Sequence, residues 1–298
     1  MKRGWITWDK TELPPSAFEA RLAKVRQHLA ASDLPALVAY TDVWRSNQGR
    51  YLANFMPYWN RALLVIPRDG ATVLLSGLTP RVYPWIRSVT ILEDIRPNMN
   101  LAKMCDENGW TKVGVLDLPL LPYDLSVSNA VHVPWSAIHP EPDDAELSMY
   151  RHAAKIAREI LIEESINGVG GIDHEFVGRL ELKYRRAGVE DLVILVTNGQ
   201  TVPLPPNGQT LGEAFSVVVA LEYRGHWVKF ALPIMGQCDG ESTFNVELLS
   251  GPYPYESCSQ AAIKPGAIFA VHQEFQENGS RLFMGDSYWQ GPNGPEIL

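Results

Sequence analysis

Residues 215–232 read FSVVVALEYRGHWVKFAL, and this stretch decides the fold of the second half of the chain. It holds two runs of β-branched, aliphatic and aromatic residues, 215–221 and 226–232, on either side of a turn that contains glycine. Similar runs at 193–196 and 268–271 are set apart by clusters of Gly, Pro and Asn. Strand-forming runs separated by turn residues predict an antiparallel sheet.

Two helices are predicted ahead of this sheet. Asp143 and Glu146 form a capping signature, and apolar residues then recur at helical spacing to about residue 164. A second amphipathic helix is predicted over 175–186. The sequence GVGG at 168–171 stops the first helix, and it is not a phosphate loop because it follows a helix and lacks a lysine.

The first half of the chain alternates helices and strands. Ser16 and Glu19 form a capping signature for a helix over 17–31, and a polar helix is predicted over 101–108. Strands are predicted over 37–40, 62–66, 71–75 and 113–116, of which the middle two form a hairpin. The proline-rich stretch 132–142 has no period and suits a linker. We therefore expect an α/β domain over 1–138 and an α+β domain over 139–298.

The composition excludes several classes of protein. The 298 residues suffice for two domains, and 46% hydrophobic with 20% charged residues is typical of a globular chain. A formal net charge of -8 repels nucleic-acid phosphates, and no apolar stretch approaches the roughly 20 residues that span a bilayer. The three cysteines form no C-x-x-C pair, which suits reduced thiols. We expect a cytoplasmic protein with no nucleic-acid or membrane partner.

Several short phrases carry a family resemblance. In chain order they are QGRYLANF at 48–55, DDAEL at 143–147 with RHAA at 151–154, RGHW at 224–227, KPGAIF at 264–269, and GDS at 285–287 with GPEIL at 294–298. Together they resemble the creatinase/aminopeptidase P family, the pita-bread metallopeptidases, over nearly the whole chain. The resemblance implies a creatinase-like α/β domain over 1–138, a pita-bread α+β domain over 139–298, hydrolase chemistry and a dimer.

The metal ligands of that family do not transfer to this sequence. The family holds two divalent cations with two Asp, one His and two Glu, because carboxylates offset the charge of the cations. Here the first aspartate falls on Val218, the second on Lys229, the first glutamate on His272 and the last on Gly285. Only 236–263 separates the flanking strands, so we expect a truncated domain without the histidine segment and the two helices before it. We therefore expect no metal and no cofactor.

The metal-free mechanism of creatinase, which uses a histidine and a glutamate, does not transfer either. The loop expected to carry the histidine reads TVPLPPN at 201–207, and the glutamate position holds Ala231.

Lys229 and His272 remain as candidate catalytic residues. Side chains alternate along a strand, so Trp227, Lys229 and Ala231 share the face that the resemblance directs at the former metal site. An ammonium there could bind a substrate carboxylate in place of a cation, and desolvation would lower its pKa toward that of a useful base. His272, expected opposite, could exchange a proton near neutral pH.

Glu274 and Asp286 are candidate substrate-binding neighbours of this pair. The alternative is structural: Lys229 pairs with Glu222, Glu274 or Asp286 only to keep a vestigial cavity neutral.

Four more candidate substrate-binding residues have structural alternatives as well. His226 contacts substrate or is a core residue with a local hydrogen bond, and Tyr255 lines a remodelled pocket or packs on the core. In the first domain, Arg50 and Trp59 clamp an anionic or planar ligand or pack in a dimer interface.

Two functions follow from this set of residues. One is a metal-independent, creatinase-like hydrolase acting on a small, polar, carboxylate-bearing C–N compound such as an amide or amidine. The other is a catalytically inactive pseudoenzyme that serves as a binding or partner subunit, in a homodimer or in a heterodimer with an active paralogue. A polar pocket at the altered positions favours the enzyme, and a filled core favours the pseudoenzyme.

Overall fold

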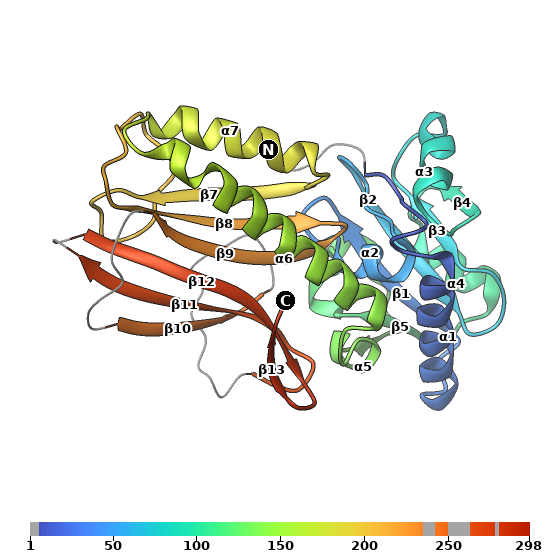
Figure 1. Cartoon of the computed structure of the whole chain (residues 1–298). Coiled ribbons are helices and arrows are strands. Elements are labelled where there is room, and N and C mark those ends of the chain that lie inside the picture. The colour runs from blue at the N-terminus through green and yellow to red at the C-terminus, as the bar shows by residue number, and fades with distance from the viewer. Residues whose placement is uncertain (1–5, 235–241, 250–262, 278–279) are drawn as a thin grey trace. The chain divides into compact units, whose positions relative to one another are not determined.

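The computed structural model describes residues 6–234, 242–249, 263–277 and 280–298 (Figure 1). The chain divides into two compact units, one over Lys2–Pro140 and one over Glu141–Leu298. None of the helices in the described ranges is both long enough and apolar enough to cross a membrane.

The unit over Lys2–Pro140 is an α/β domain built on a six-stranded sheet in the order β4-β3-β2-β1-β5-β6. Its strands are β1 Ala36–Asp42, β2 Arg61–Pro67, β3 Val73–Ser76, β4 Asp94–Pro97, β5 Val113–Leu116 and β6 Ala130–Val133. The β2 strand runs antiparallel to β1 and β3, while β3 with β4, β1 with β5 and β5 with β6 are parallel. Alternate residues of β1 face two separate cores: Leu37 and Ala39 pack on one side, and Val38 and Tyr40 on the other.

The helices of this unit are α1 Pro15–Ala31, α2 Asn47–Ala53, α3 Tyr83–Val89, α4 Leu101–Asn108 and α5 Trp135–Ile138, with 3-10 turns η1 Pro80–Val82, η2 Leu118–Leu120 and η3 Tyr123–Leu125. The predicted hairpin of β2 and β3 is confirmed. The predicted cap of α1 is wrong: the helix begins at Pro15, and its N-cap Pro14 makes no side-chain cap bond. Proline suits position 15, the first residue of the helix, because the N–H at that position would have no partner inside the helix.

The unit over Glu141–Leu298 joins two helices to an antiparallel sheet. The helices are α6 Asp144–Ser165 and α7 Asp173–Arg186, with the 3-10 turn η4 Ile166–Gly168 between them. The strands are β7 Asp191–Thr197, β8 Phe215–Tyr223, β9 His226–Ile234, β10 Ser242–Leu248, β11 Ile268–Glu277, β12 Ser280–Gly291 and β13 Gly294–Ile297. Their order is β10-β11-β12-β9-β8-β7, with β13 paired to β12. The predicted capping box of Asp143 and Glu146 is present.

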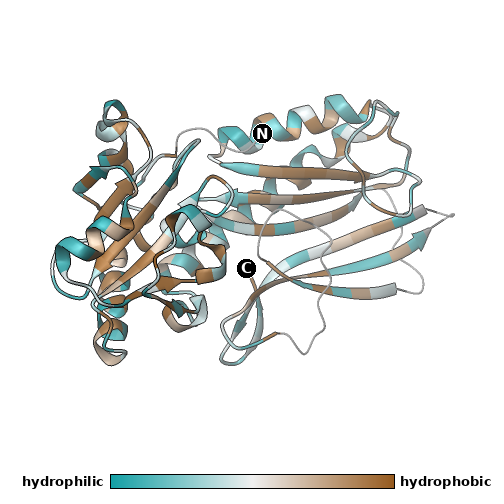
Figure 2. Cartoon of the chain, turned by 180° about the vertical axis from the view of Figure 1, so that it is seen from behind, coloured by the Kyte–Doolittle hydropathy of each residue, from teal (hydrophilic) through white to brown (hydrophobic). Residues whose placement is uncertain are grey.

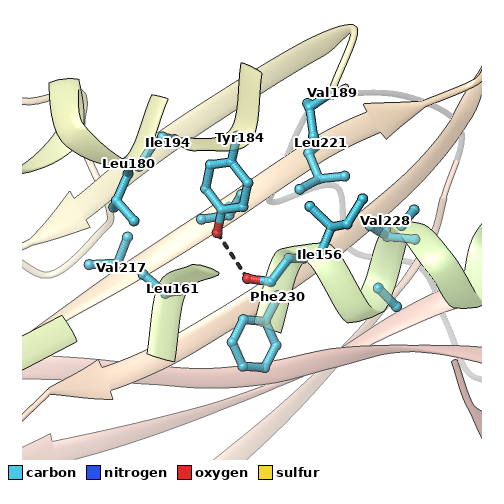
Figure 3. Packing of buried hydrophobic residues seen from close by; sticks show 14 of the residues in the cluster. Ile156, Leu161, Leu180, Tyr184, Val189, Ile194, Val217, Leu221, Val228 and Phe230 are labelled. Carbon is cyan, nitrogen blue, oxygen red and sulfur yellow. Dashed lines mark hydrogen bonds between the residues drawn. The ribbon is translucent and has the colours of Figure 1, made fainter. Parts of the chain in front are cut away.

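The main core of this second unit lies between the two helices and strands β7 to β9 (Figure 3). The Tyr184 hydroxyl of α7 donates a hydrogen bond of 2.9 Å to the Ala157 carbonyl of α6, which ties the helices together across apolar side chains. On β9, Val228 and Phe230 belong to this core. Because side chains alternate, the residue between them, Lys229, points to the other face of the sheet. In Figure 2 the strands next to the helices are largely hydrophobic, as a buried layer requires.

Candidate functional site

The central residue of the candidate site is Lys229, which β9 holds on the face of the sheet away from the helices. Its neighbour across the β8–β9 ladder is Ala220, and Val218 pairs with Ala231 two residues along. Val218 and Ala231 form a small apolar cluster with Phe283. The Lys229 side chain is only 2% exposed, so its charge requires a buried partner.

That partner is Glu247 of β10. The Lys229 Nζ donates to Oε1 of Glu247, and the glutamate is also only 2% exposed. The expected alternatives for a partner of Lys229 were Glu222, Glu274 and Asp286, and Glu247 was missed. The stretch around it was expected to be a shortened connection, whereas the described part of that stretch is a strand paired with β11.

His272 lies beside this ion pair. Its Nε2 is 3.9 Å from Oε2 of Glu247, and the imidazole is 2% exposed. Burial, followed by the nearby charge of Lys229, lowers the pKa of His272 to about 4, because both disfavour the protonated form. The imidazole is therefore neutral near pH 7. The structure thus brings the two predicted catalytic residues together, with Glu247 next to both.

Because Gly285 has no side chain, it leaves room for the imidazole of His272. The two residues are paired in the β11–β12 ladder, and a Cβ added at position 285 would lie 2.6 Å from Nδ1 of His272. Gly285 also pairs with Ala231, where β12 runs antiparallel to β9. Two residues on, the Ser287 hydroxyl accepts a hydrogen bond from the Lys229 N–H and donates one to the Lys229 carbonyl, both 2.8 Å long. Ser287 therefore fixes the backbone of Lys229, and Glu247 binds its side chain.

Two predicted substrate-binding residues of this unit lie on the helix side of the sheet. Asp286 is next to Gly285, so it projects from the opposite face of β12, where Arg158 of α6 binds it at 2.7 and 3.0 Å. His226 also lies on the helix side, with its ring 4.8 Å from that of Tyr150. These two residues do not join Lys229.

Glu274 does share a face with His272, two positions along β11. Its carboxylate accepts hydrogen bonds from Asn245 at 2.7 Å and from Arg281 at 3.2 Å. The structure therefore places Glu274 in an ion pair and not at Lys229.

The remaining predicted residues lie elsewhere. Arg50 is buried in α2 of the other unit, and Trp59 of that unit is 61% exposed, with its ring 6.0 Å from Tyr58. Tyr255 is outside the described residues.

The side chains at the positions that the family resemblance aligns with metal ligands do not fit a pair of divalent cations. Val218 and Gly285 offer no donor atom, and the ammonium of Lys229 is itself a cation. In the described parts of the chain, no three His, Cys, Asp or Glu side chains gather as a metal-binding group.

Solved structures are similar to this chain over nearly its whole length. A prolidase from Pyrococcus horikoshii OT3 superposes with a TM-score of 0.66 at 11% identity, over 93% of this chain and 97% of its own. The dipeptidase PepE from Mycobacterium ulcerans gives 0.67 at 13% identity, over 98% and 96%. The N-terminal domain of the FACT complex subunit SPT16 from Eremothecium gossypii gives 0.60 at 10% identity, over 95% of each chain.

The chain has the pita-bread fold. The expected fold class is thereby confirmed, with an α/β domain first and the pita-bread domain second. No family model and no curated protein sequence matches the chain. At 10–13% identity the structural likeness establishes the fold alone, and the pita-bread fold is shared by peptidases and by a domain of a FACT subunit.

Proposed function

We propose that this chain is a catalytically inactive pita-bread protein that serves as a binding or partner subunit. The observation that carries the proposal is the buried ion pair of Lys229 and Glu247. A substrate carboxylate would have to displace Glu247 from the ammonium inside a region with almost no solvent exposure. Separating a buried ion pair costs several kcal/mol, and this cost exceeds the binding free energy that a single ionic contact with a small ligand contributes.

The surroundings of the ion pair support the same proposal. Val218, Ala231 and Phe283 pack on this face of the sheet as an apolar cluster, which is the arrangement of a filled core. The SPT16 domain gives a precedent for this fold within a subunit of a complex. We propose a cytoplasmic dimer, formed with a second copy or with an active chain of the same fold.

The first test is enzymatic. The purified chain is assayed with Xaa-Pro dipeptides, other dipeptides, and small carboxylate-bearing amides and amidines, with and without added Mn²⁺, Co²⁺ or Zn²⁺. The prolidase from Pyrococcus furiosus is the positive control for the assay. We expect no turnover above that of Lys229→Ala. The proposal would be refuted if the native chain and the exposed control Lys155→Ala both turned over a substrate and Lys229→Ala did not.

The second test concerns the partner. Native mass spectrometry of the chain isolated from its own cells should give a dimer with a second chain of the same fold, or a homodimer that carries a ligand from the same extract. A homodimer that contains no other chain and binds no ligand from the same extract would count against a partner role.

A metal-independent hydrolase is the second candidate, and one observation favours it. The neutral imidazole of His272 lies 3.9 Å from Glu247, next to an ammonium that could hold a substrate carboxylate. Its pKa of about 4 makes it a weak base near pH 7, so this mechanism also requires substrate binding to raise that pKa. In this mechanism Glu247 would have to release Lys229 when substrate arrives. The assay that tests the first proposal therefore decides between the two, because this mechanism requires both Lys229 and His272.

A further inference from the structure

The unit over Lys2–Pro140 has a hollow of about 640 Å³ at one edge of its sheet. The parallel strands β3 and β4 end there, at Ser76 and Pro97, and the segments that follow both strands line the hollow. The segment 124–126, which comes after β5, forms a third wall. In open α/β sheets, ligands bind outside the carboxyl ends of the strands, since the loops that leave those ends can diverge around a molecule.

The lining combines an apolar floor with a polar rim. Leu78, Leu101 and Leu125 are buried beneath the hollow. Around them stand exposed side chains with hydroxyl or amide groups, namely Thr79, Asn98, Asn100 and Ser126. Hydroxyl and amide groups both donate and accept, so this rim suits a ligand rich in groups of the same kind.

The charge of the lining selects against ions. Asp124 is the one charged residue among those described around the hollow, and both of its carboxylate oxygens accept hydrogen bonds from Arg61, at 3.1 and 2.6 Å. This pairing leaves the lining without net charge. A phosphate, a carboxylate or an ammonium would therefore find no counter-charge there, whereas a neutral ligand needs none.

Two exposed aromatic residues lie near the lining segments in the chain. Tyr123 is 94% exposed and adjoins Asp124 in sequence. Trp59 is 61% exposed and precedes Asn60, whose Nδ2 donates a hydrogen bond of 2.7 Å to the carbonyl of Gly77 in the lining. Within the hollow itself, the leucine floor beside hydroxyl and amide groups matches the two chemical faces of a sugar, with C–H bonds on one side and hydroxyls at the edge.

We propose that this hollow binds a neutral saccharide, with its hydroxyls bonded to Thr79, Asn98 and Ser126 and its apolar face over the leucine floor. The site belongs to the first unit and uses no residue of the Lys229 cluster. It therefore stands whether or not the proposed function of the second unit holds.

The test is an NMR titration of the full isotope-labelled chain with neutral mono- and disaccharides at millimolar concentration. Amide signals of residues 76–79, 98–102 and 124–126 should shift. The double variant Thr79→Val/Asn98→Gly should bind roughly tenfold more weakly, since it removes two hydrogen-bonding side chains. Glycine suits position 98 because Asn98 has a φ of 65°, so the backbone can stay as it is.

The matched control is Thr111→Val. Thr111 is exposed and lies just before β5, at the amino ends of the parallel strands, whereas the hollow lies at the carboxyl ends. The affinity of this variant for saccharides should equal that of the native chain. Three results would overturn the proposal: no shift with any saccharide, shifts with uridine or a neutral dipeptide amide in place of saccharides, or equal affinity in the native chain and the double variant.

Discussion

Lys229→Met retains most of the length of the side chain and removes its charge, so it isolates the role of the ammonium. Both members of the Lys229–Glu247 pair are only 2% exposed, so the variant leaves a buried carboxylate without its cation. Breaking a buried pair in this way costs about 3–5 kcal/mol. The free energy is read from hydrogen exchange of the β9 amides in a urea series, which reports on the second unit alone. The loss should shrink in acid, because the orphaned carboxylate can then take up a proton.

Two further variants complete this experiment. Lys229→Met/Glu247→Leu removes both charges and should recover most of the lost stability, since an apolar pair of similar volume is often as stable as a buried ion pair. Lys155→Met, at an exposed lysine paired with Glu159, should change stability by less than about 0.5 kcal/mol. A loss below about 1 kcal/mol in Lys229→Met, or an equal loss in the double variant, would refute the assignment of Glu247 as the partner.

Three other predictions concern single positions. The pKa of His272, lowered to about 4, lies below that of an unfolded histidine, so the free energy of unfolding falls as the pH drops from about 6.5 toward 4. Urea titrations at about pH 7 and pH 4 measure this loss, and His272→Gln should make it smaller by about 2–3 kcal/mol. Gly285→Ala should cost about 1–3 kcal/mol in the same titration, whereas Gly178→Ala, in an open position of α7, should be neutral or stabilising. Asp143→Ala should lower the melting temperature, through a loss of about 1 kcal/mol with the capping box.

The fold could be predicted where local patterns coincide with the elements. Periodicity and the capping box predicted α6, and the apolar runs predicted β7, β8, β9 and the start of β11. Strand β12 was not predicted, because Gly285, Asp286 and Ser287 interrupt its apolar pattern. Each of these residues is explained by distant contacts: the Asp286 bond to Arg158, for instance, joins residues 128 positions apart. Such contacts leave no local signal in a sequence.

The candidate site could be predicted in part. Alternation along the strand put Trp227, Lys229 and Ala231 on one face, with His272 opposite Lys229 by the family resemblance, and the structure places Lys229 away from the helices and near His272. Glu247 was missed although residues 242–248, STFNVEL, alternate apolar Phe244, Val246 and Leu248 with polar residues, the pattern of a strand with one polar face. The expectation of a shortened connection outweighed that pattern. His226 and Asp286 were chosen because they lie close in sequence to the family motifs. Alternate residues of a strand face opposite sides of the sheet, and both residues fall on the side away from Lys229.

The close fit at Gly285 restricts which residues the protein can accept at that position. A glutamate would collide with the His272 imidazole through its Cβ alone, before its carboxylate reached any partner. Exchanging His272 for a smaller residue would not open the position, because the same Cβ would lie 2.6 Å from the backbone carbonyl oxygen of Val271. A side chain at position 285 therefore requires the backbones of β11 and β12 to move apart, and a change at position 272 alone does not prepare the site for an acidic residue.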